Sequence, residues 1–294
     1  MTLATHAPAT RAPVTAAGTF QISGKFEVAR LGFGTMQLTG DGVWGQPADL
    51  EGAKRVLKHA RDIGITLFDT ADSYGPDIAE TLVHDALSPY NGLLVATKGG
   101  LTRPGPNVWV PNGRPEYLRE AVLGSMKRLG MSMIPLWQLH RIDSKVPRDD
   151  QFGAVAELRA EGLIDQVGLS EVTVEDIRAA EHFFKVATVQ NIYNLGNRKY
   201  ESVVLYCEQN NIGFIPWYPL GNGALAKPGG ALAKVAAKHR ATPAQIAIAW
   251  LLHRSHVMLP IPGTKSIAHL EENVAAAGIK LDAADMDALN APSH

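Results

Sequence analysis

The sequence predicts an α/β protein, a single (β/α)8 TIM barrel preceded by an N-terminal β-hairpin. Eight short apolar runs, each about as long as one buried strand, alternate with stretches of helical character. No linker rich in Pro, Gly or Ser interrupts this series, so one domain is expected. A doubly wound open sheet is the weaker alternative, because the first run, "GFGTMQLTG", lacks the third glycine of a G-x-G-x-x-G motif.

The N-terminal 18 residues are expected to be a flexible tail outside the fold. They are rich in Ala, Thr and Pro and contain no continuous apolar stretch of the kind found in signal peptides. The barrel domain is then expected over 19–294. At its start, "FQISGKFEVARLGFGT" alternates apolar and polar residues around Ser23-Gly24, which predicts the hairpin.

The strands and helices of the barrel are predicted from the alternation of these patterns along the chain. The predicted strands are 31–35, 66–69, 93–97, 136–140, 166–169, 188–191, 213–216 and 257–261. The predicted helices are 50–62, 114–129, 151–161, 174–181, 202–210, 243–253 and 267–276.

Composition limits the class of partner. Hydrophobic residues make up 46% of the chain, charged residues 19%, and the formal net charge is −1, so we expect a small-molecule partner and neither nucleic acid nor anionic lipid. The single cysteine, Cys207, excludes an internal disulfide and a multi-cysteine metal cluster, and it fits a cytoplasmic location. The apolar run 246–252 is far shorter than the roughly 20 residues that span a bilayer, so no membrane segment is expected.

Ionisable residues end three consecutive predicted strands. Asp69 ends the second strand, Lys98 follows the third and His140 ends the fourth, while Tyr74 lies in the loop just after Asp69. Each has an ordinary structural interpretation: a helix cap, a solvated strand end, a hydrogen-bonded core histidine and loop packing. Because the carboxyl ends of barrel strands meet at one rim, we expect the four side chains to form one site.

The ordered set of motifs resembles the aldo-keto reductases, NADPH-dependent carbonyl reductases built on this barrel. The resemblance covers about residues 20–276 and is carried by "LGFGTMQL", "LFDTADSYG", "VATKGG", "WQLHRID", "VGLSEV", "VQNIYNL", "IPWYPLG" and "LPIPGTKSIAHLEENVAA". It implies that Asp69, Tyr74, Lys98 and His140 are the catalytic residues. Within the family, "GVWG", "ADSYGP" and "TKGGLTRPGP" are most similar to bacterial members related to pyridoxal reductases, which makes pyridoxal a candidate substrate.

The four residues suit reduction of a carbonyl group. Hydride addition leaves negative charge on oxygen, so the site needs a proton donor, for which we expect Tyr74. A buried Lys98 ammonium would bring the tyrosine pKa from about 10 towards about 7, and Asp69 would keep that lysine charged. His140 would donate a hydrogen bond to the substrate oxygen.

The same resemblance implies the residues that bind the cofactor. Ser170 and Gln190 match the residues that hold the nicotinamide carboxamide, and Trp217 matches the aromatic residue that stacks on the ring. Glu171 replaces an asparagine of many members, and Gly263 and His269 replace a lysine and an arginine of some, so NADPH is expected with NADH possible. The expected cofactor-binding residues are Gly34, Thr35, Met36, Asp69, Ser170, Gln190, Trp217, Pro219, Leu220, Gly263, Thr264, Lys265, Glu272 and Asn273.

Two tryptophans are expected at the mouth of the barrel. Trp44 and Trp109 lie in the loops after the first and third strands, where they suit an aromatic carbonyl compound or serve as loop anchors. A metal-dependent hydrolase is disfavoured because the first strand has no histidine, so no metal is expected. An NADPH-binding redox-sensing or interaction subunit with little turnover is the alternative function, and the oligomeric state stays open.

Overall fold

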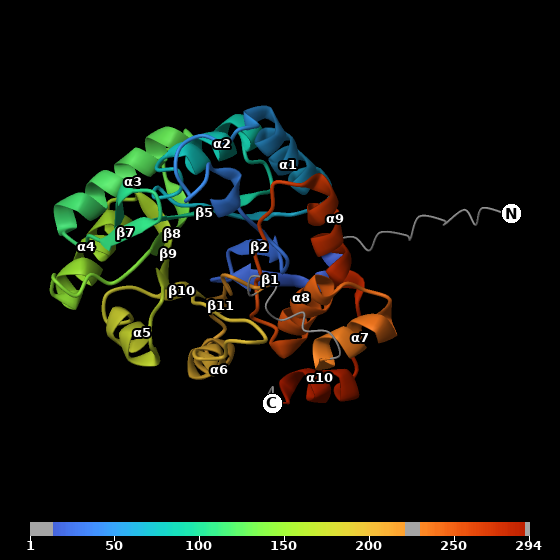
Figure 1. Cartoon of the computed structure of the whole chain (residues 1–294). Helices are drawn as coiled ribbons and strands as arrows, with labels where there is room; N and C mark the ends of the chain where they lie inside the picture. The colour runs from blue at the N-terminus through green and yellow to red at the C-terminus, as the bar shows by residue number, and fades with distance from the viewer. Residues whose placement is uncertain (1–13, 221–229, 292–294) are drawn as a thin grey trace, which may run out of the picture.

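A parallel sheet forms the centre of the computed structural model, which describes residues 14–220 and 230–291 (Figure 1). Its seven strands are hydrogen-bonded in the order β11-β10-β9-β8-β5-β4-β3, and every neighbouring pair is parallel. Since all strands point the same way, their carboxyl ends meet at one edge. The strands are β3 (Phe33–Gly34), β4 (Leu67–Asp69), β5 (Leu94–Gly99), β8 (Ile134–Leu139), β9 (Ile164–Ser170), β10 (Val186–Gln190) and β11 (Gly213–Phe214).

The predicted eighth strand is not formed as a regular strand. Residues 257–261 instead make isolated backbone contacts with both edges of the sheet: Phe214 N–H donates to Val257 O at 2.8 Å, and Gly32 N–H donates to Pro260 O at 2.9 Å. Pro260 and Pro262 have no N–H to donate, which prevents a continuous ladder through this segment. The sheet is therefore curled, with an irregular segment between its first and last strands.

Helices lie on the outside of the sheet (Figure 1). Among them, α3 packs on β5 and β8, α4 on β9 and α6 on β11. The seven predicted helices are present with shifts of at most a few residues at their ends. The described helices are α1 (Leu50–Asp62), α2 (Ile78–Leu87), α3 (Pro115–Leu129), α4 (Arg148–Ala160), α5 (Val174–Ala180), α6 (Glu201–Gln209), α7 (Ala231–His239), α8 (Pro243–Arg254), α9 (Ile267–Ala275) and α10 (Ala283–Asn290).

Three helices, α2, α7 and α10, were not predicted. The sequence before α2 has the usual start pattern, Asp77 followed three residues later by Glu80, but Asp77 adopts a left-handed conformation with φ of 68° and makes no side-chain cap. By contrast, α10 begins with a capping box between Asp282 and Asp285, a pattern that could have revealed it.

The N-terminal hairpin, β1 (Thr19–Ile22) and β2 (Phe26–Ala29), covers the amino ends of the strands. Ala29 N–H donates to Thr66 Oγ1 at 2.8 Å, just before β4, and Lys25 pairs with Asp165 at the start of β9. The face with the carboxyl ends is therefore left free for a site. The hairpin was predicted at this position.

The predicted tail is too long at its C-terminal end. Residues Val14–Ala17 form a short 3-10 helix, η1, in which the Val14 side chain is fully buried. This segment packs against η4 (Ala276–Gly278) and so belongs to the fold. The rest of the predicted tail, residues 1–13, lies outside the described residues.

A second hairpin, not predicted, follows β5 at the carboxyl edge. It consists of β6 (Leu101–Gly105) and β7 (Val108–Pro111), which pair antiparallel. It places the loop that follows the third predicted strand over the open face of the sheet.

The seam between β3 and the segment 257–261 requires small residues. A Cβ on Gly32, just before β3, would lie 3.1 Å from Ile261 Cγ2 across the seam and 2.8 Å from the backbone oxygen of Leu67 in β4, whereas a Cβ on Gly105 would have nothing within 4 Å. We predict that Gly32→Ala lowers the free energy of unfolding by about 1–3 kcal/mol, the cost of overpacking, whereas Gly105→Ala changes it little. Urea unfolding of the two variants measures this, and equal midpoints would contradict the role of the seam.

Candidate active site

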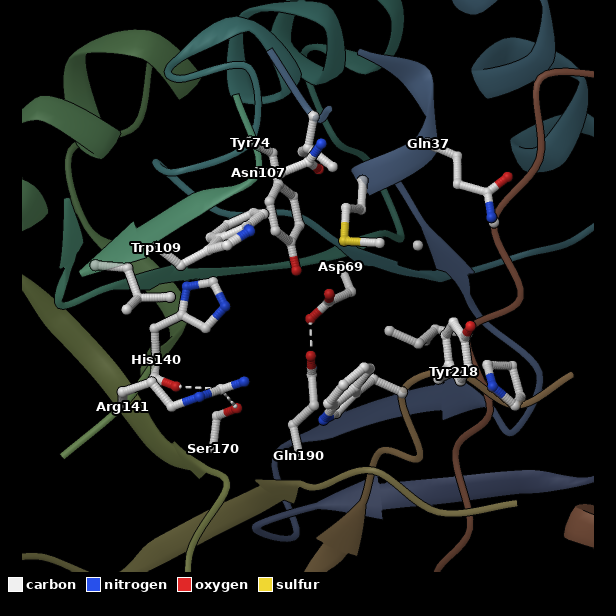
Figure 2. Close-up of a pocket in the computed structure, with 18 of the residues that line it drawn as sticks. Gln37, Asp69, Tyr74, Asn107, Trp109, His140, Arg141, Ser170, Gln190 and Tyr218 are labelled. Atoms are coloured by element: carbon white, nitrogen blue, oxygen red, sulfur yellow. Dashed lines mark hydrogen bonds between the residues drawn. The ribbon is translucent and has the colours of Figure 1, made fainter. Parts of the chain in front are cut away.

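A cavity of about 570 Å³ opens at the carboxyl edge of the sheet (Figure 2). Its size is typical of small-molecule sites. Eleven of the residues predicted for the site line it: Gly34, Met36, Asp69, Tyr74, Trp109, His140, Ser170, Gln190, Trp217, Pro219 and Gly263. The other lining residues are Gln37, Val43, Leu101, Asn107, Pro111, Arg141, Tyr218 and Ile261.

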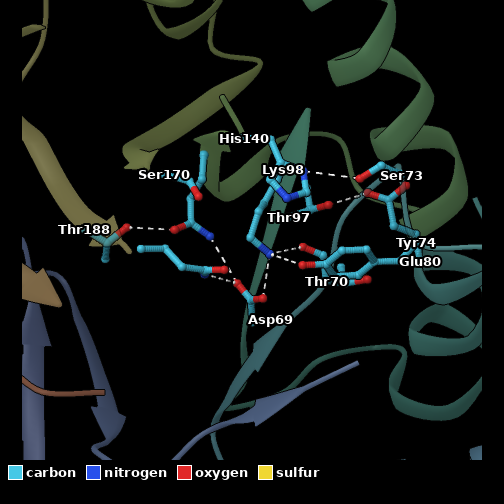
Figure 3. Close-up of polar contacts among 12 residues, drawn as sticks. Asp69, Thr70, Ser73, Tyr74, Glu80, Thr97, Lys98, His140, Ser170 and Thr188 are labelled. Carbon is cyan, nitrogen blue, oxygen red and sulfur yellow. Dashed lines mark hydrogen bonds and ion pairs between the residues drawn. The ribbon is translucent and has the colours of Figure 1, made fainter. Parts of the chain in front are cut away.

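Asp69, Lys98 and Tyr74 form a buried polar chain beneath the cavity (Figure 3). The Lys98 ammonium donates to Asp69 Oδ2 at 2.6 Å, to Thr70 O at 2.9 Å and to Tyr74 OH at 3.2 Å. An ammonium has three hydrogens, and these three acceptors use all of them. Because the Tyr74 oxygen accepts from Lys98, its own hydrogen is free to be donated to a molecule in the cavity.

The second oxygen of Asp69 is held by two glutamine side chains. Asp69 Oδ1 accepts from Gln190 Nε2 at 2.8 Å and from Gln138 Nε2 at 3.1 Å. The Thr188 hydroxyl in turn donates to Gln138 Oε1. Gln138 was not predicted to be part of the site. The signal for it is present in "LWQLH", because residues two apart on a strand share a face, and Gln138 precedes His140 by two.

Burial and charge set the protonation of this chain. Burial alone would lower the pKa of Lys98, but the Asp69 carboxylate raises it, so the ammonium stays charged. Burial raises the pKa of Tyr74, and the nearby Lys98 charge opposes that rise without cancelling it. The expectation that the tyrosine pKa falls towards 7 is therefore wrong, because desolvation of the phenolate outweighs the attraction of Lys98.

His140 is a neutral imidazole in this environment. Burial, together with the charges of Lys98, Arg141 and Arg103, holds its pKa well below the usual value. Its Nδ1 lies 3.2 Å from the hydroxyl oxygen of Ser73. If Ser73 donates to Nδ1, the remaining hydrogen of the ring is on Nε2, available as a hydrogen-bond donor.

Aromatic rings form one wall of the cavity. Tyr74, His140 and Trp109 meet edge to face, with ring centroids 5.9–6.3 Å apart. Arg103 fixes this arrangement: its guanidinium lies 3.6 Å from the centre of the Trp109 ring and donates to the carbonyls of Ser73, Val108 and Gly42. Arg103 therefore joins the β6–β7 hairpin to the loop that carries Tyr74, a role that we did not predict.

Trp44 does not line the cavity, in contrast to the prediction. Its backbone pairs with Gly75, and its ring lies 5.7 Å from the Arg103 guanidinium carbon. The physical reason is that the Arg103 guanidinium attracts both tryptophan rings, and of the two only Trp109 lines the cavity. Trp44 thus serves as a loop anchor, which was the alternative role that the sequence analysis gave it.

Trp217 also lines the cavity and is held by Glu171. The indole Nε1 donates to Glu171 Oε1 at 2.6 Å, an oxygen that also accepts from Ile192 N–H at 2.6 Å. Glu171 Oε2 accepts from the Tyr200 hydroxyl at 3.1 Å. The departure from asparagine at this position thus has a structural role, which is to orient the tryptophan.

The last predicted group lies around the N-terminus of α9. Gly263 lines the cavity, Thr264 is buried and accepts from Ser266 N–H at 3.0 Å, and Lys265 is exposed with no described ion-pair partner. A helix N-terminus next to a free lysine suits phosphate groups. Further along α9, Asn273 is buried, and Glu272 accepts from Thr242 Oγ1 at 2.6 Å.

Two further predicted cofactor residues, Thr35 and Leu220, do not line the cavity but are adjacent in sequence to residues that do. Thr35 is buried, and its hydroxyl has no hydrogen-bond partner among the described residues. Leu220 is half-buried against the core at the end of the described part of its loop. A nicotinamide dinucleotide needs backbone that phosphates can approach, polar groups without a protein partner and an aromatic surface. Gly263, the Thr35 hydroxyl and Trp217 provide these features next to the buried Asp69–Lys98 pair.

Comparisons with known proteins decide the family. The model of the aldo/keto reductase family matches residues 30–293. The chain belongs to this family. An uncharacterized oxidoreductase of Schizosaccharomyces pombe is 57% identical over 90% of this chain and 86% of its own. Pyridoxine 4-dehydrogenase of Escherichia coli is 37% identical over 90% of this chain and 94% of its own. The structure of a glycerol dehydrogenase of Gluconobacter oxydans has a TM-score of 0.84 at 27% identity, covering 93% of this chain and 94% of that one.

Membership of the aldo/keto reductases confirms the predicted enzyme class, an oxidoreductase of this family. It also confirms the resemblance from which the site residues were predicted. No helix within residues 14–220 and 230–291 is both long and apolar enough to cross a membrane. In the same ranges, no cluster of three or more His, Cys, Asp or Glu side chains could hold a metal ion.

Proposed function

We propose that this reductase converts an aldehyde or ketone to the alcohol, with Tyr74 as the proton donor. One observation carries the proposal: Lys98 lies between Asp69 and Tyr74, and its hydrogen bond leaves the tyrosine proton free at the floor of the cavity. When bound, NADPH supplies the hydride to the carbonyl carbon. The C=O π electrons move to oxygen, and the Tyr74 O–H bond breaks as its proton joins that oxygen.

The environment of Tyr74 suits this acid role. Its raised pKa keeps the phenol protonated at neutral pH, which is the state that an acid needs before reaction. The Lys98 ammonium then stabilises the phenolate that remains. Asp69 keeps Lys98 charged and in place, and solvent restores the proton afterwards.

His140 is proposed to orient the substrate. As a neutral imidazole that accepts from Ser73 at Nδ1, it can donate through Nε2 to the carbonyl oxygen. Together with Tyr74 it would place two donors on the oxygen where negative charge develops. Trp109, edge-on to both rings, suits the flat face of an aromatic substrate.

The cofactor is proposed to lie across the cavity from Trp217 to α9. Trp217 would stack on the nicotinamide ring, and Ser170 with Gln190 would hold its carboxamide. The phosphates would be held by Gly263, Thr264 and Lys265. The adenine end is assigned to Glu272 and Asn273, and the rim contacts to Gly34, Thr35, Met36, Pro219 and Leu220.

Pyridoxal is the proposed substrate within this reaction class, supported by the E. coli pyridoxine 4-dehydrogenase relative and the aromatic cavity wall. We further propose that the sheet and the segment 257–261 constitute a (β/α)8 barrel as one domain, and that the enzyme works in the cytoplasm.

An NADPH-binding subunit without turnover is the competing function. NADPH oxidation with a panel of aldehydes that includes pyridoxal separates the two.

We predict that Tyr74→Phe loses at least about 100-fold in kcat, since general acid catalysis contributes ~10²–10⁴ in rate. NADPH affinity should change only a few-fold, because the phenyl ring and the Trp217 wall remain. Steady-state kinetics and tryptophan fluorescence titration measure the two quantities. Tyr206→Phe, which removes an exposed hydroxyl on α6, is the matched control. A Tyr74→Phe enzyme with near-normal kcat would rule out Tyr74 as the acid.

The proposed phosphate contact predicts a difference between the two cofactors. Lys265→Ala should weaken NADPH about 10-fold or more and NADH much less, because only NADPH carries the 2′-phosphate with which the ammonium would pair. Lys280→Ala, another exposed lysine, is the control. Dissociation constants from fluorescence titration provide the test, and equal losses for both cofactors would place Lys265 away from the 2′-phosphate.

A further inference from the structure

Arg141 lines the cavity next to His140 with most of its hydrogen-bonding capacity unused. Only one of its three guanidinium nitrogens has a described acceptor: Nη1 donates to His140 O at 2.6 Å and to Ser170 Oγ at 3.0 Å. Figure 2 shows the guanidinium reaching between His140 and Ser170 into the space that the Tyr74 hydroxyl also faces. A cationic fork is thus presented beside the proposed point of reaction.

The second arginine of this region shows what a purely structural guanidinium looks like here. All three nitrogens of Arg103 donate to backbone carbonyls, and its face covers Trp109. Arg103 is therefore satisfied by the protein itself. Arg141 is not, although it is half-buried and burial lowers its pKa.

No carboxylate in the described part of the chain forms an ion pair with Arg141. Among the described residues, Asp69 is the only acid that lines the cavity, and both its oxygens already accept hydrogen bonds from Lys98, Gln138 and Gln190. Glu171 acts on Arg141 only at longer range, and its oxygens are occupied by Trp217, Ile192 and Tyr200. A half-buried cation without such a partner favours an anion supplied by a ligand.

We propose that Arg141 selects carbonyl substrates that carry an anionic group, a carboxylate or a phosphate, at a distance from the carbonyl. The proposal rests on the proposed function, because it assumes that the carbonyl lies against Tyr74 and His140. The planar fork can bind two oxygens of such a group at once. Aromatic contact with Trp109 and charge pairing with Arg141 would then act on two ends of one substrate.

The test compares two aldehydes of similar shape, 4-carboxybenzaldehyde and its methyl ester. The measured quantity is the ratio of their kcat/KM values in the full-length enzyme with NADPH. We expect Arg141→Met to lower this ratio by about 10- to 100-fold, the usual effect of losing a hydrogen-bonded charge pair. Arg141→Lys, which keeps the charge, should recover part of the loss. Arg55→Met, on the exposed face of α1, should leave the ratio unchanged.

A second pair of substrates distinguishes the two anions. The kcat/KM ratio of pyridoxal 5′-phosphate to pyridoxal should fall in Arg141→Met if the fork accepts phosphate, and a fall confined to one pair identifies the preferred group. The proposal is overturned if Arg141→Met leaves both ratios as in the wild type. It is also overturned if the variant alters only the affinity for NADPH, since Arg141 would then serve the cofactor.

A binding measurement separates this proposal from the proposed function. If no aldehyde is turned over, the reductase proposal fails, but anion selection can still be measured with benzoate and benzamide by calorimetry in the presence of NADP⁺. Tighter binding of benzoate than of benzamide in the wild type, lost in Arg141→Met, supports the role of Arg141. Equal affinities for the two probes contradict it.

Discussion

The buried ion pair between Lys98 and Asp69 is the interaction on which the site depends. The Lys98 side chain is completely inaccessible to solvent, so its charge is retained only because Asp69 lies 2.6 Å away. Removing one partner of such a pair typically costs ~3–5 kcal/mol, since the other charge is left buried and unpaired. The other hydrogen bonds of the two groups fix three further side chains. Lys98 also donates to Tyr74, and Asp69 also accepts from Gln138 and Gln190. One ion pair thus orders side chains from β4, β5, β8 and β10.

The parallel sheet makes this convergence possible. Strands β4, β5 and β8 are neighbours, so Asp69, Lys98 and His140 reach the same edge although far apart in sequence. The loop that carries Tyr74 is then fixed from the other side by Arg103, which binds the carbonyl of Ser73. The charged residues Asp69 and Lys98 therefore come from the strands, whereas the β6–β7 hairpin holds the loop that carries Tyr74.

The sequence predicted those parts of the fold and site that follow from local patterns. Strand-end polar residues identified Asp69, Lys98 and His140, and helical periodicity predicted α1 with its ends as observed. Prediction from the sequence failed where contacts between residues far apart in the chain determine the structure. Prolines interrupt the eighth strand through lost donors, and the contact of Trp44 with Arg103 could not be known from its position in a loop. The pKa of Tyr74 depends on a balance between burial and charge that needs coordinates.

The central claim is that Lys98 stabilises the Tyr74 phenolate, and the pKa of Tyr74 tests it most directly. Tyrosinate absorbance after a rapid jump to alkaline pH, taken as the difference from a Tyr74→Phe protein, isolates this residue. The account predicts a higher pKa of Tyr74 in Lys98→Met than in the wild type, since Lys98 is the cation that the described residues place within hydrogen-bond distance of the phenol. The double variant Asp69→Asn/Lys98→Met, which leaves no buried carboxylate unpaired, should also show a higher pKa than the wild type. An unchanged or lower pKa in both variants would contradict the account.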